Sequence, residues 1–471
     1  LPPGLGAFVA NLAIVLAGKI PVNLNFTIGR AAAEACLRKG GLRSVVSAPA
    51  LREKVPDFPW PEDTLDVAAE IVALGRARIL PWLLAGRLLP GQVVANLLDL
   101  PREGGDDEAA LLFTSGSSGE PKGVVLSHRN ILSNCRQVRE TGLLQPGQTM
   151  IGCLPVFHSF GFTVTLWYPI LHRMRVATFP SPLETRRIAE IIATEEAEVL
   201  IGAPTFLRPF LKRARREQLR SLTLVVAGAE KMPIELFEAF QEQLGVPIRE
   251  GYGLTETTPV LAVNRPDPVP LAAGGKGIGF RLGSVGLLLP GIEARVVDPQ
   301  SGETLPCGAT GVMVVRGPNV FRGYHDDAAA TEAVLRDGWF TTGDLARFDE
   351  DGFLYIEGRL SRFSKVGGEM VPHVTVEQRI IEVMGWREFE SQPVVVVGVP
   401  DAAKGESLVA LTTEAVSADV LRDRLAAEGM PNLWIPKLVI QVDRIPTLGT
   451  GKLDLQGCRR LAETAADTGR S

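Results

Sequence analysis

Residues 111–123 contain the side chains best suited to phosphate binding in this chain. An apolar strand end runs into a turn rich in glycine and hydroxyl residues with one lysine. Glycine lets the backbone approach a ligand closely, and clustered N–H dipoles form an anion-binding concavity. The residues that would surround the anion are Thr114, Ser115, Gly116, Ser117, Ser118, Gly119 and Lys122. We therefore predict a polyphosphate site.

Two other interpretations of this stretch fit its residues less well. A flexible Gly/Ser linker would have no need of the flanking strands or of the lysine. A P-loop of the Walker type would place Gly-Lys-Ser/Thr in register, whereas here Pro121 precedes Lys122 and Gly123 follows it. The phosphate-binding turn is therefore of another type.

Two acids on glycine-rich turns could hold the rest of a nucleotide. Glu256, in G-Y-G-L-T-E (251–256), is a candidate Mg²⁺ ligand, because a cation that bridges phosphates takes one or two protein carboxylates. Asp344, in T-G-D (342–344), has two oxygens spaced to accept hydrogen bonds from a vicinal diol such as a ribose. Taken alone, Glu256 could be a solvated surface acid and Asp344 an ordinary turn residue.

Other residues could complete such a site. Tyr252 offers a flat face for a purine, and residues 227–230 lie at a strand end, where ligands bind in open α/β sheets. The Arg359 guanidinium suits phosphate or ribose oxygens. Lys452 lies on the near-terminal glycine-rich turn 446–452, which domain motion could carry into a site. That turn fits the Walker motif only in part, since Leu453 replaces the hydroxyl residue.

Composition limits the possible functions. A chain of 471 residues exceeds one hydrophobic core, so two or more domains are expected. The net charge of −5 argues against nucleic acid as the main partner. Five cysteines without a C-x-x-C pair favour a reducing compartment and mostly buried thiols. The five histidines lack ligand spacing, so no structural metal is predicted.

The order of the elements predicts an α/β fold. Short apolar strands alternate with helical patterns from 106 to 250, which indicates a largely parallel sheet with strands near 111–114, 150–154, 174–179, 198–202 and 222–227. A helix should begin at Pro233 and end at Gly245. Glycine-punctuated strands follow residue 280, with a hairpin at an Asp-Gly turn in 348–356. Beyond residue 358, strands at 394–399, 408–413 and 438–443 belong to a further unit.

We therefore predict a large N-terminal domain, residues 1–360, of mixed and largely parallel sheets with helices and a β-barrel-like part. A small mobile α+β domain, residues 361–471, would follow. The helical pattern starts abruptly at Leu1, so a missing first segment is suspected. No signal peptide and no run of ~18 uncharged apolar residues is visible. The apolar residues 79–89 are expected to pack under a loop, or alternatively to lie against a membrane surface.

The motifs, taken in order, resemble those of the adenylate-forming ligases, which include acyl-CoA synthetases, luciferases and peptide-synthetase adenylation domains. The matching strings are F-T-S-G-S-S-G-E-P-K-G (113–123), P-V-F-H-S-F-G (155–161), G-Y-G-L-T-E (251–256), T-G-D (342–344), G-R-x₅-K-x-x-G (358–368) and P-x₃-T-G-K (446–452). They cover nearly the whole chain. One departure is Ser361-Arg362, where the family often has an acidic hinge residue.

The resemblance implies a role for each matching residue. Thr114 to Lys122 would hold the β- and γ-phosphates, and Glu256 with Thr114 the Mg²⁺, assisted by Thr255. Gly228, Ala229, Glu230, Tyr252 and Gly253 would border the adenine, and Asp344 and Arg359 the ribose. His158 would lie between nucleotide and acyl group, and Lys452 at the reacting α-phosphate. The cofactors implied are ATP, Mg²⁺ and an acceptor that carries phosphopantetheine.

The last third most resembles the ligase part of bifunctional acyl-[acyl carrier protein] synthetase/2-acylglycerophosphoethanolamine acyltransferases, through R-F-S-K-V-G-G-E-M-V (362–371) and K-G-E-S-L-V-A-L-T-T (404–413). This resemblance implies an upstream acyltransferase domain, activation of a long-chain fatty acid, and transfer to acyl carrier protein. The alternatives are a fatty acyl-CoA ligase that uses coenzyme A and a non-catalytic nucleotide-binding scaffold. The expected location is cytoplasmic, with the membrane face as a possible site of peripheral attachment.

An acidic carrier protein would need a basic surface on this enzyme. Six cations within residues 208–220 form one candidate surface, and a solvated helix face is the alternative interpretation. A second candidate lies beside the expected thiol entrance and consists of Arg359, Arg362, Lys365 and Arg379.

Overall fold

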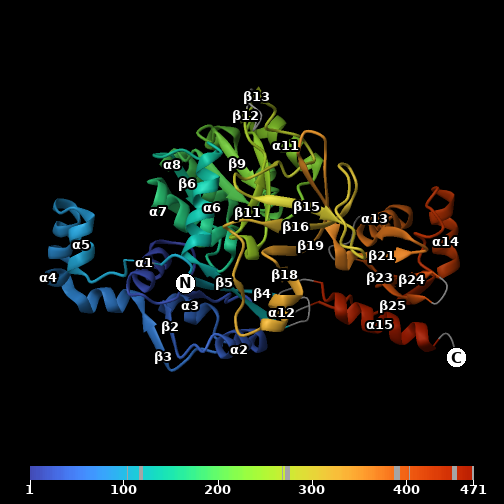
Figure 1. The fold of residues 1–471 in the computed structure, drawn as a ribbon, viewed down its shortest axis with the longest axis horizontal. Helices are drawn as coiled ribbons and strands as arrows, with labels where there is room; N and C mark the ends of the chain where they lie inside the picture. Colours follow the sequence, from blue (N-terminus) through green and yellow to red (C-terminus); the bar gives the residue numbers. More distant parts are fainter. Residues whose placement is uncertain are drawn as a thin grey trace.

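The computed structural model describes residues 1–102, 104–115, 120–267, 269–270, 276–386, 393–401, 404–447 and 453–468. The chain forms a large body of several sheets and helices, with a smaller unit built from its last third (Figure 1). The mixed α/β fold class predicted from the sequence is confirmed.

A seven-stranded sheet forms the centre of the large body. Its order is β14 (Leu287–Leu288), β11 (Val260–Val263), β10 (Ile248–Gly253), β9 (Leu224–Ala227), β8 (Val199–Gly202), β6 (Thr149–Gly152) and β7 (Arg175–Thr178). The strands from β10 to β7 pair in parallel, as predicted, whereas β11 and β14 are antiparallel. Side chains alternate between the two faces: Val199 and Ile201 enter one core cluster and Leu200 enters another.

Helices cover the second of these faces. They are α8 (Thr185–Glu195), α9 (Pro204–Leu207), α10 (Phe210–Arg213) and α11 (Ile234–Leu244). α11 has Pro233 at its N-cap and Gly245 at its C-cap with φ 72°, as the sequence predicted. It buries Leu236, Phe240 and Leu244 at helical spacing. The π-helix η1 (Phe160–Trp167) continues into α7 (Tyr168–His172), both on the side of the first cluster.

The strands β4 (Glu108–Ser115) and β5 (Pro121–Ser127) flank the predicted phosphate-binding turn and form the phosphate-loop hairpin. This hairpin belongs to a separate sheet of order β1 (Val22–Asn23), β4, β5, β17 (Gly323–Tyr324). β5 leads directly into α6 (His128–Glu140), which begins with a capping box between Ser127 and Asn130. The Asn130 side-chain nitrogen also donates to the Pro318 and Val320 carbonyl oxygens, 2.8 Å each. This buried amide holds the chain segment that leads into β17 against the hairpin.

A third sheet contains β15 (Glu293–Val297), β16 (Gly311–Arg316), β19 (Trp339–Phe348) and β18 (Leu335–Arg336), with β20 (Leu354–Arg359) on β19. The predicted hairpin is the β19–β20 pair, closed by a turn in which Gly352 has φ 84°. α12 (Ala328–Val334) joins β17 to this sheet. Smaller pairs are formed by β2 (Ser44–Ser47) with β3 (Asp63–Asp66), and by β12 (Val269–Pro270) with β13 (Lys276–Gly277).

The last third forms its own sheet of order β22 (Glu369–Pro372), β21 (Phe363–Val366), β24 (Gly405–Thr412), β23 (Val394–Asp401), with β25 (Leu438–Gln441) parallel to β24. Alternate residues of β23 enter two core clusters. α13 (His373–Met384) and α14 (Ala418–Ala427) cover one face of this sheet, and α15 (Leu455–Thr468) covers the other. The three strands predicted here are confirmed.

A buried ion pair anchors the chain where it enters this unit. Arg362, in the 3₁₀ turn η4 (Leu360–Arg362), contacts Glu377 of α13 with its Nη2. Their side chains are 11% and 3% exposed, and Glu377 also accepts from the Val396 amide at 2.6 Å. Burial raises the pKa of Glu377, an effect that the Arg362 charge opposes. Arg362 is therefore not part of a basic surface, which corrects that part of the sequence interpretation.

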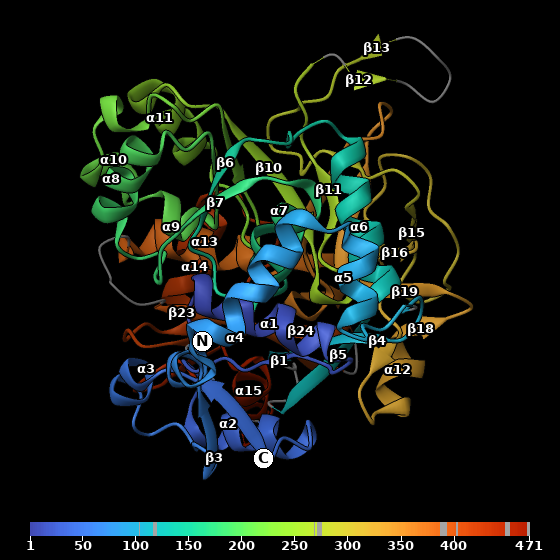
Figure 2. The ribbon, with the colours of Figure 1, turned by 90° about the vertical axis from the view of Figure 1, so that its left-hand side faces the viewer.

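Residues 79–89 do not pack under a loop, which corrects another expectation. They lie in α4 (Val67–Leu88), which has no buried residue, and neither has the following α5 (Gly91–Leu97). Both helices project from the N-terminal part of the chain (Figures 1 and 2). That part also contains α1 (Leu5–Leu16), α2 (Arg30–Lys39) and α3 (Pro49–Lys54). Among the described residues, no helix is long and apolar enough to cross a membrane.

Replacement of Glu377 by Ala should destabilise the last third of the chain. The change leaves the Arg362 charge buried without its partner, which costs about 3–5 kcal/mol. Hydrogen exchange of β23 and β24 peptides in the full chain would measure the effect. The control is Glu382→Ala on the same helix, because Glu382 pairs with Arg379 at 3.2 Å in an exposed position. Equal protection in the two variants would contradict the assigned importance of the buried pair.

Candidate active site

Asp344 is a buried carboxylate at which three strands meet. It lies on β19 opposite Arg359 of β20, whose Nε is 2.6 Å from Asp344 Oδ1. The Tyr252 hydroxyl, from β10, donates to Asp344 Oδ2. Asp344 is 2% exposed, and this burial raises its pKa against the opposing effect of the Arg359 charge. Asp344 and Arg359, predicted to act together, are therefore in contact.

Tyr252 takes part in the Asp344 cluster through its hydroxyl. The hydroxyl donates to Asp344 and the ring packs against the main core, while the contact of its ring face with a purine stays a prediction. Burial, followed by the Asp344 charge, raises the pKa of Tyr252 well above its ordinary value. The phenol therefore remains a protonated donor that orients the Asp344 carboxylate.

A second cluster joins the phosphate-loop hairpin to Glu256. Lys122 pairs with Thr114 across β4 and β5, and its Nζ lies 4.9 Å from the centroid of the Tyr324 ring. The Tyr324 hydroxyl donates to Glu256 Oε1 at 3.0 Å. Burial and then the Glu256 charge raise the pKa of Tyr324. Lys122, predicted to bind phosphate, and Glu256, predicted to bind the metal, thus both contact Tyr324.

The two clusters lie within electrostatic reach of each other. The Glu256 charge adds to the raised pKa of Asp344, although burial is the main cause. The Arg359 charge in turn acts to lower the pKa of Tyr324. The groups predicted for ribose, metal and phosphate therefore lie near one another: Asp344 on β19, Arg359 at the end of β20, Lys122 on β5 and Glu256 on the turn after β10.

The 155–161 segment borders the same region. Ser159 Oγ lies 3.3 Å from Thr255 Oγ1, so this segment meets the turn that carries Glu256. His158 is exposed, with its ring centroid 4.7 Å from that of Phe157. Gly253 requires its lack of a side chain, because a Cβ there would lie 1.7 Å from the Pro259 carbonyl oxygen.

Residues 228–230 follow the end of β9, as predicted. Gly228 is buried against Phe160, and Ala229 has a φ of 69°, which an L-residue adopts at a cost. Glu230 accepts hydrogen bonds from the Thr205 amide, at 3.1 Å, and from the Thr205 hydroxyl. The Glu230 carboxylate therefore fixes this loop to the start of α9.

Some predicted residues lie outside the described part of the chain. These are Gly116, Ser117, Ser118, Gly119 and Lys452. Ser115 is placed only by its backbone, which pairs with Pro121 at the end of the hairpin.

A comparison with protein families shows to which family the chain belongs. Residues 1–325 match the model described as "AMP-binding enzyme". The chain belongs to the AMP-binding enzyme family. The superfamily predicted from the motifs is confirmed, and so is its enzyme class, an AMP-forming acid–thiol ligase.

Relatives of this AMP-binding enzyme include a feruloyl-CoA synthase from Amycolatopsis sp, 30% identical over 464 residues, which is 96% of this chain and 86% of that protein. A long-chain-fatty-acid–CoA ligase from Bacillus subtilis is 31% identical over 372 residues, 77% of this chain and 63% of that protein. ATP-bound MatB from Rhodopseudomonas palustris, a solved structure, has TM-score 0.72 at 27% identity and covers 98% of this chain and 87% of that chain.

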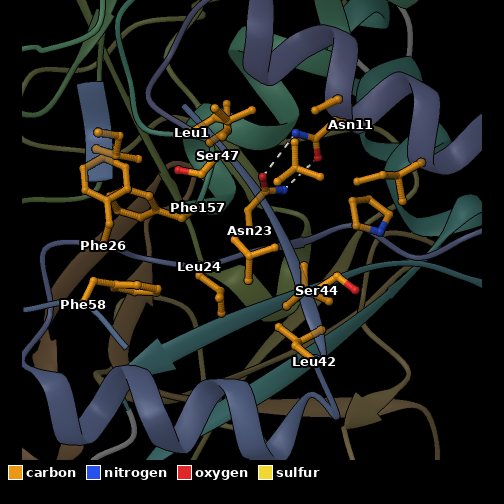
Figure 3. Close-up of a pocket in the computed structure, with 18 of the residues that line it drawn as sticks. Leu1, Asn11, Asn23, Leu24, Phe26, Leu42, Ser44, Ser47, Phe58 and Phe157 are labelled. Carbon is orange, nitrogen blue, oxygen red and sulfur yellow. Dashed lines mark hydrogen bonds between the residues drawn. The ribbon is translucent and has the colours of Figure 1, made fainter. Parts of the chain in front are cut away.

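An apolar cavity of about 160 Å³ lies on the N-terminal side of the AMP-binding enzyme (Figure 3). α1, β1, β2 and the residues Val156 and Phe157 contribute to its walls. Asn11 and Asn23 form two reciprocal side-chain hydrogen bonds there, 3.2 and 2.8 Å long. None of the site residues predicted from the sequence is among the residues that line this cavity, although Val156 and Phe157 belong to the 155–161 segment.

The donors present fit a magnesium ion that is held mainly by phosphate oxygens. Glu256 supplies one carboxylate, and Mg²⁺ in such sites takes one or two together with substrate phosphates and water. Within the described residues no group of three or more His, Cys, Asp or Glu side chains could hold a metal alone. Glu256 can therefore serve as a Mg²⁺ ligand only together with a bound polyphosphate.

Tyr324 is the contact residue that sequence reasoning missed. A single tyrosine after Gly323 has no distinctive spacing, and its two partners lie 68 and 202 positions away in the chain. Only the pairing of β17 with β5 brings it to Lys122.

Tyr324→Phe should weaken the dependence of activity on Mg²⁺ while leaving KM for ATP nearly unchanged. The phenylalanine keeps the ring beside Lys122 but removes the donor that orients Glu256, an effect of about tenfold in rate. Tyr324→Leu should also raise KM for ATP, because the cation–π contact is lost. Pyrophosphate-release kinetics at varied Mg²⁺ and ATP would measure both changes.

The control for these two variants is Tyr355→Phe. Tyr355 likewise donates to a carboxylate, that of Asp349, at 3.2 Å, but outside the two clusters. If Tyr324→Phe behaves like this control at every Mg²⁺ concentration, Tyr324 does not position Glu256.

Glu250 should make stability depend on pH. Burial raises its pKa to about 7, against the hydrogen bond from the Met232 amide at 3.1 Å and the Lys231 charge. The folded state therefore holds a proton that the unfolded state releases near pH 4.5, so stability should fall as the pH rises from about 4.5 to 7. Glu250→Gln should reduce this fall in the free energy of unfolding by about 2–3 kcal/mol. Calorimetric unfolding at several pH values would test it, with the exposed Glu242→Gln as control.

Proposed function

We propose that the enzyme converts a fatty acid and ATP into acyl-AMP and pyrophosphate, and then transfers the acyl group to the thiol of coenzyme A. A carboxylate oxygen attacks the α-phosphorus, and the bond to the bridging oxygen breaks as pyrophosphate leaves. The thiol then loses its proton and attacks the acyl carbon, which releases AMP. Both steps depend mostly on positioning and on charge neutralisation.

The observation that carries this proposal is the convergence of the Lys122–Tyr324–Glu256 cluster with the Tyr252–Asp344–Arg359 cluster. We assign Lys122 and the turn 114–119 to the β- and γ-phosphates, and Glu256 with Thr114 to Mg²⁺, which would neutralise the phosphate charge. Thr255 assists them from beside Ser159.

The remaining roles follow from the same placement. Asp344 and Arg359 would bind the ribose, since they lie opposite each other on β19 and β20 and already orient each other. Gly228, Ala229, Glu230, Tyr252 and Gly253 would form the adenine wall. We assign His158 to the boundary between the nucleotide and the acyl group, because it is an exposed residue of the 155–161 segment. Lys452 would reach the α-phosphate.

We further propose that the chain divides into an adenylation domain, residues 1–360, and a mobile domain, residues 361–471. The exposed Ser361 would be the hinge, with Arg362 anchored in the second unit through Glu377. An arginine buried in this way could replace the acidic hinge residue found in many relatives.

Coenzyme A is favoured as acceptor by two observations. The curated relatives named above are CoA ligases or synthases. The basic surface expected at the thiol entrance is also reduced by contacts within the chain, because Arg362 is buried and two of its other cations pair with acids. Arg362 is buried with Glu377, Arg359 contacts Asp344, and Lys365 Nζ lies 2.6 Å from Gln300 Oε1.

Acyl carrier protein is the second candidate acceptor, because the other predicted basic surface is exposed. All six of its cations are solvent-exposed, with Glu217 as the one acid among them: Arg208, Lys212, Arg213, Arg215, Arg216 and Arg220. Such a surface could attract an acidic carrier protein, mainly by raising the association rate. An upstream acyltransferase domain would accompany this second candidate.

The experiment measures the two half-reactions with fatty acids of different length and with ferulic acid. We expect acid-dependent pyrophosphate release, and a fall of about 10²–10³ in kcat for Glu256→Ala. The exposed Glu242→Ala should behave like the wild type. Thioester formation should be more efficient with coenzyme A than with carrier protein at low and at physiological salt.

Three results would contradict the proposal. Absence of pyrophosphate release with every acid would favour a non-catalytic nucleotide-binding scaffold. Faster release with ferulic acid than with any fatty acid would overturn the proposed substrate class. Greater efficiency with carrier protein, lost at high salt and in Arg213→Glu, would overturn coenzyme A as the acceptor.

A further inference from the structure

The helical arm formed by α4 and α5, residues 67–97, exposes an unusual number of large apolar side chains. Six that project from it are Leu80, Trp82, Leu83, Leu84, Leu88 and Leu97, between 45% and 74% exposed. No residue of either helix is buried. A helix that is apolar on all sides is normally covered, by protein or by lipid. Water is therefore not the expected surroundings of this arm.

The shape of the chain sets this arm apart from the rest of the molecule. α4 bends at Gly75, whose φ of 68° and ψ of 155° interrupt the helix. Beyond this bend the helix runs away from the body, and α5 packs beside it (Figures 1 and 2). The apolar residues thus lie on a projection, where an extended surface can reach them without contact with the nucleotide-binding clusters.

The charges on the arm indicate what covers it. It carries three exposed arginines, Arg76, Arg78 and Arg87, and one acid, Glu70, in a chain of net charge −5. Arginines at an apolar helix can extend their guanidinium groups to the headgroup level while the apolar side chains enter the acyl region. An isologous contact with a second copy would bring these like charges together, which is unfavourable.

We propose that the α4–α5 arm inserts into the surface of an anionic lipid bilayer and attaches the enzyme to it. The arm would lie in the headgroup and upper acyl region without crossing the membrane. This inference is independent of the acid and of the thiol acceptor, because it rests on the exposure and charge of the arm alone.

The test is flotation of the full chain with vesicles of phosphatidylcholine, with and without phosphatidylglycerol. We expect binding to both, stronger with the anionic lipid and weakened by salt. The triple variant Leu80→Glu/Leu84→Glu/Leu88→Glu should lower the partition coefficient by at least about 100-fold. Arg76→Gln/Arg78→Gln/Arg87→Gln should lose about tenfold or more, and only on the anionic vesicles.

A matched control places the same three charges on exposed apolar residues elsewhere, as Leu183→Glu/Val420→Glu/Leu461→Glu. Because every substituted side chain is exposed, melting temperatures should stay near that of the wild type, and the control should bind vesicles normally. Equal binding by both glutamate variants would overturn the proposal. A wild-type chain that does not bind vesicles would also overturn the proposal. If that chain forms a dimer which the arm variant abolishes, the arm contacts a second copy instead of lipid.

Discussion

The buried carboxylate of Asp344 connects the seven-stranded sheet of this enzyme to the five-stranded sheet that contains β19. It lies on β19 of one sheet and accepts from Tyr252 on β10 of the other, while Arg359 balances its charge. A carboxylate withdrawn from water is costly unless it has a cation and hydrogen-bond donors beside it. This requirement fixes β10, β19 and β20 relative to one another, and the groups proposed to bind the ribose lie on β19 and β20.

Other buried or partly buried acids are held by neighbouring donors in the same way. Glu256 is oriented by Tyr324, which also lies beside Lys122. Glu377 has Arg362 and a backbone amide, and thereby anchors the chain where it enters the last unit. Glu250 has only the Met232 amide and the nearby Lys231 charge, and its pKa reaches about 7.

Several elements were predictable because their cause is local. The parallel strands are short apolar runs, α11 has proline and glycine at its ends, and the β19–β20 hairpin has an Asp-Gly turn. Other expectations were wrong where the structure depends on contacts between separate parts of the chain. Arg362 was expected at the surface, yet it finds Glu377 fifteen residues later. Residues 79–89 were expected to be covered because they are apolar, yet none of them is buried.

The sequence by itself determined the family, the order of the motifs and the residue types of the site, because each motif is a contiguous stretch whose chemistry is visible in its letters. Only the tertiary structure decided which of these groups touch. Tyr252 turns its hydroxyl to Asp344, and Tyr324 stands between Lys122 and Glu256. These contacts join strands that are far apart in the chain, and their geometry follows from sheet pairing and burial, which no local pattern records.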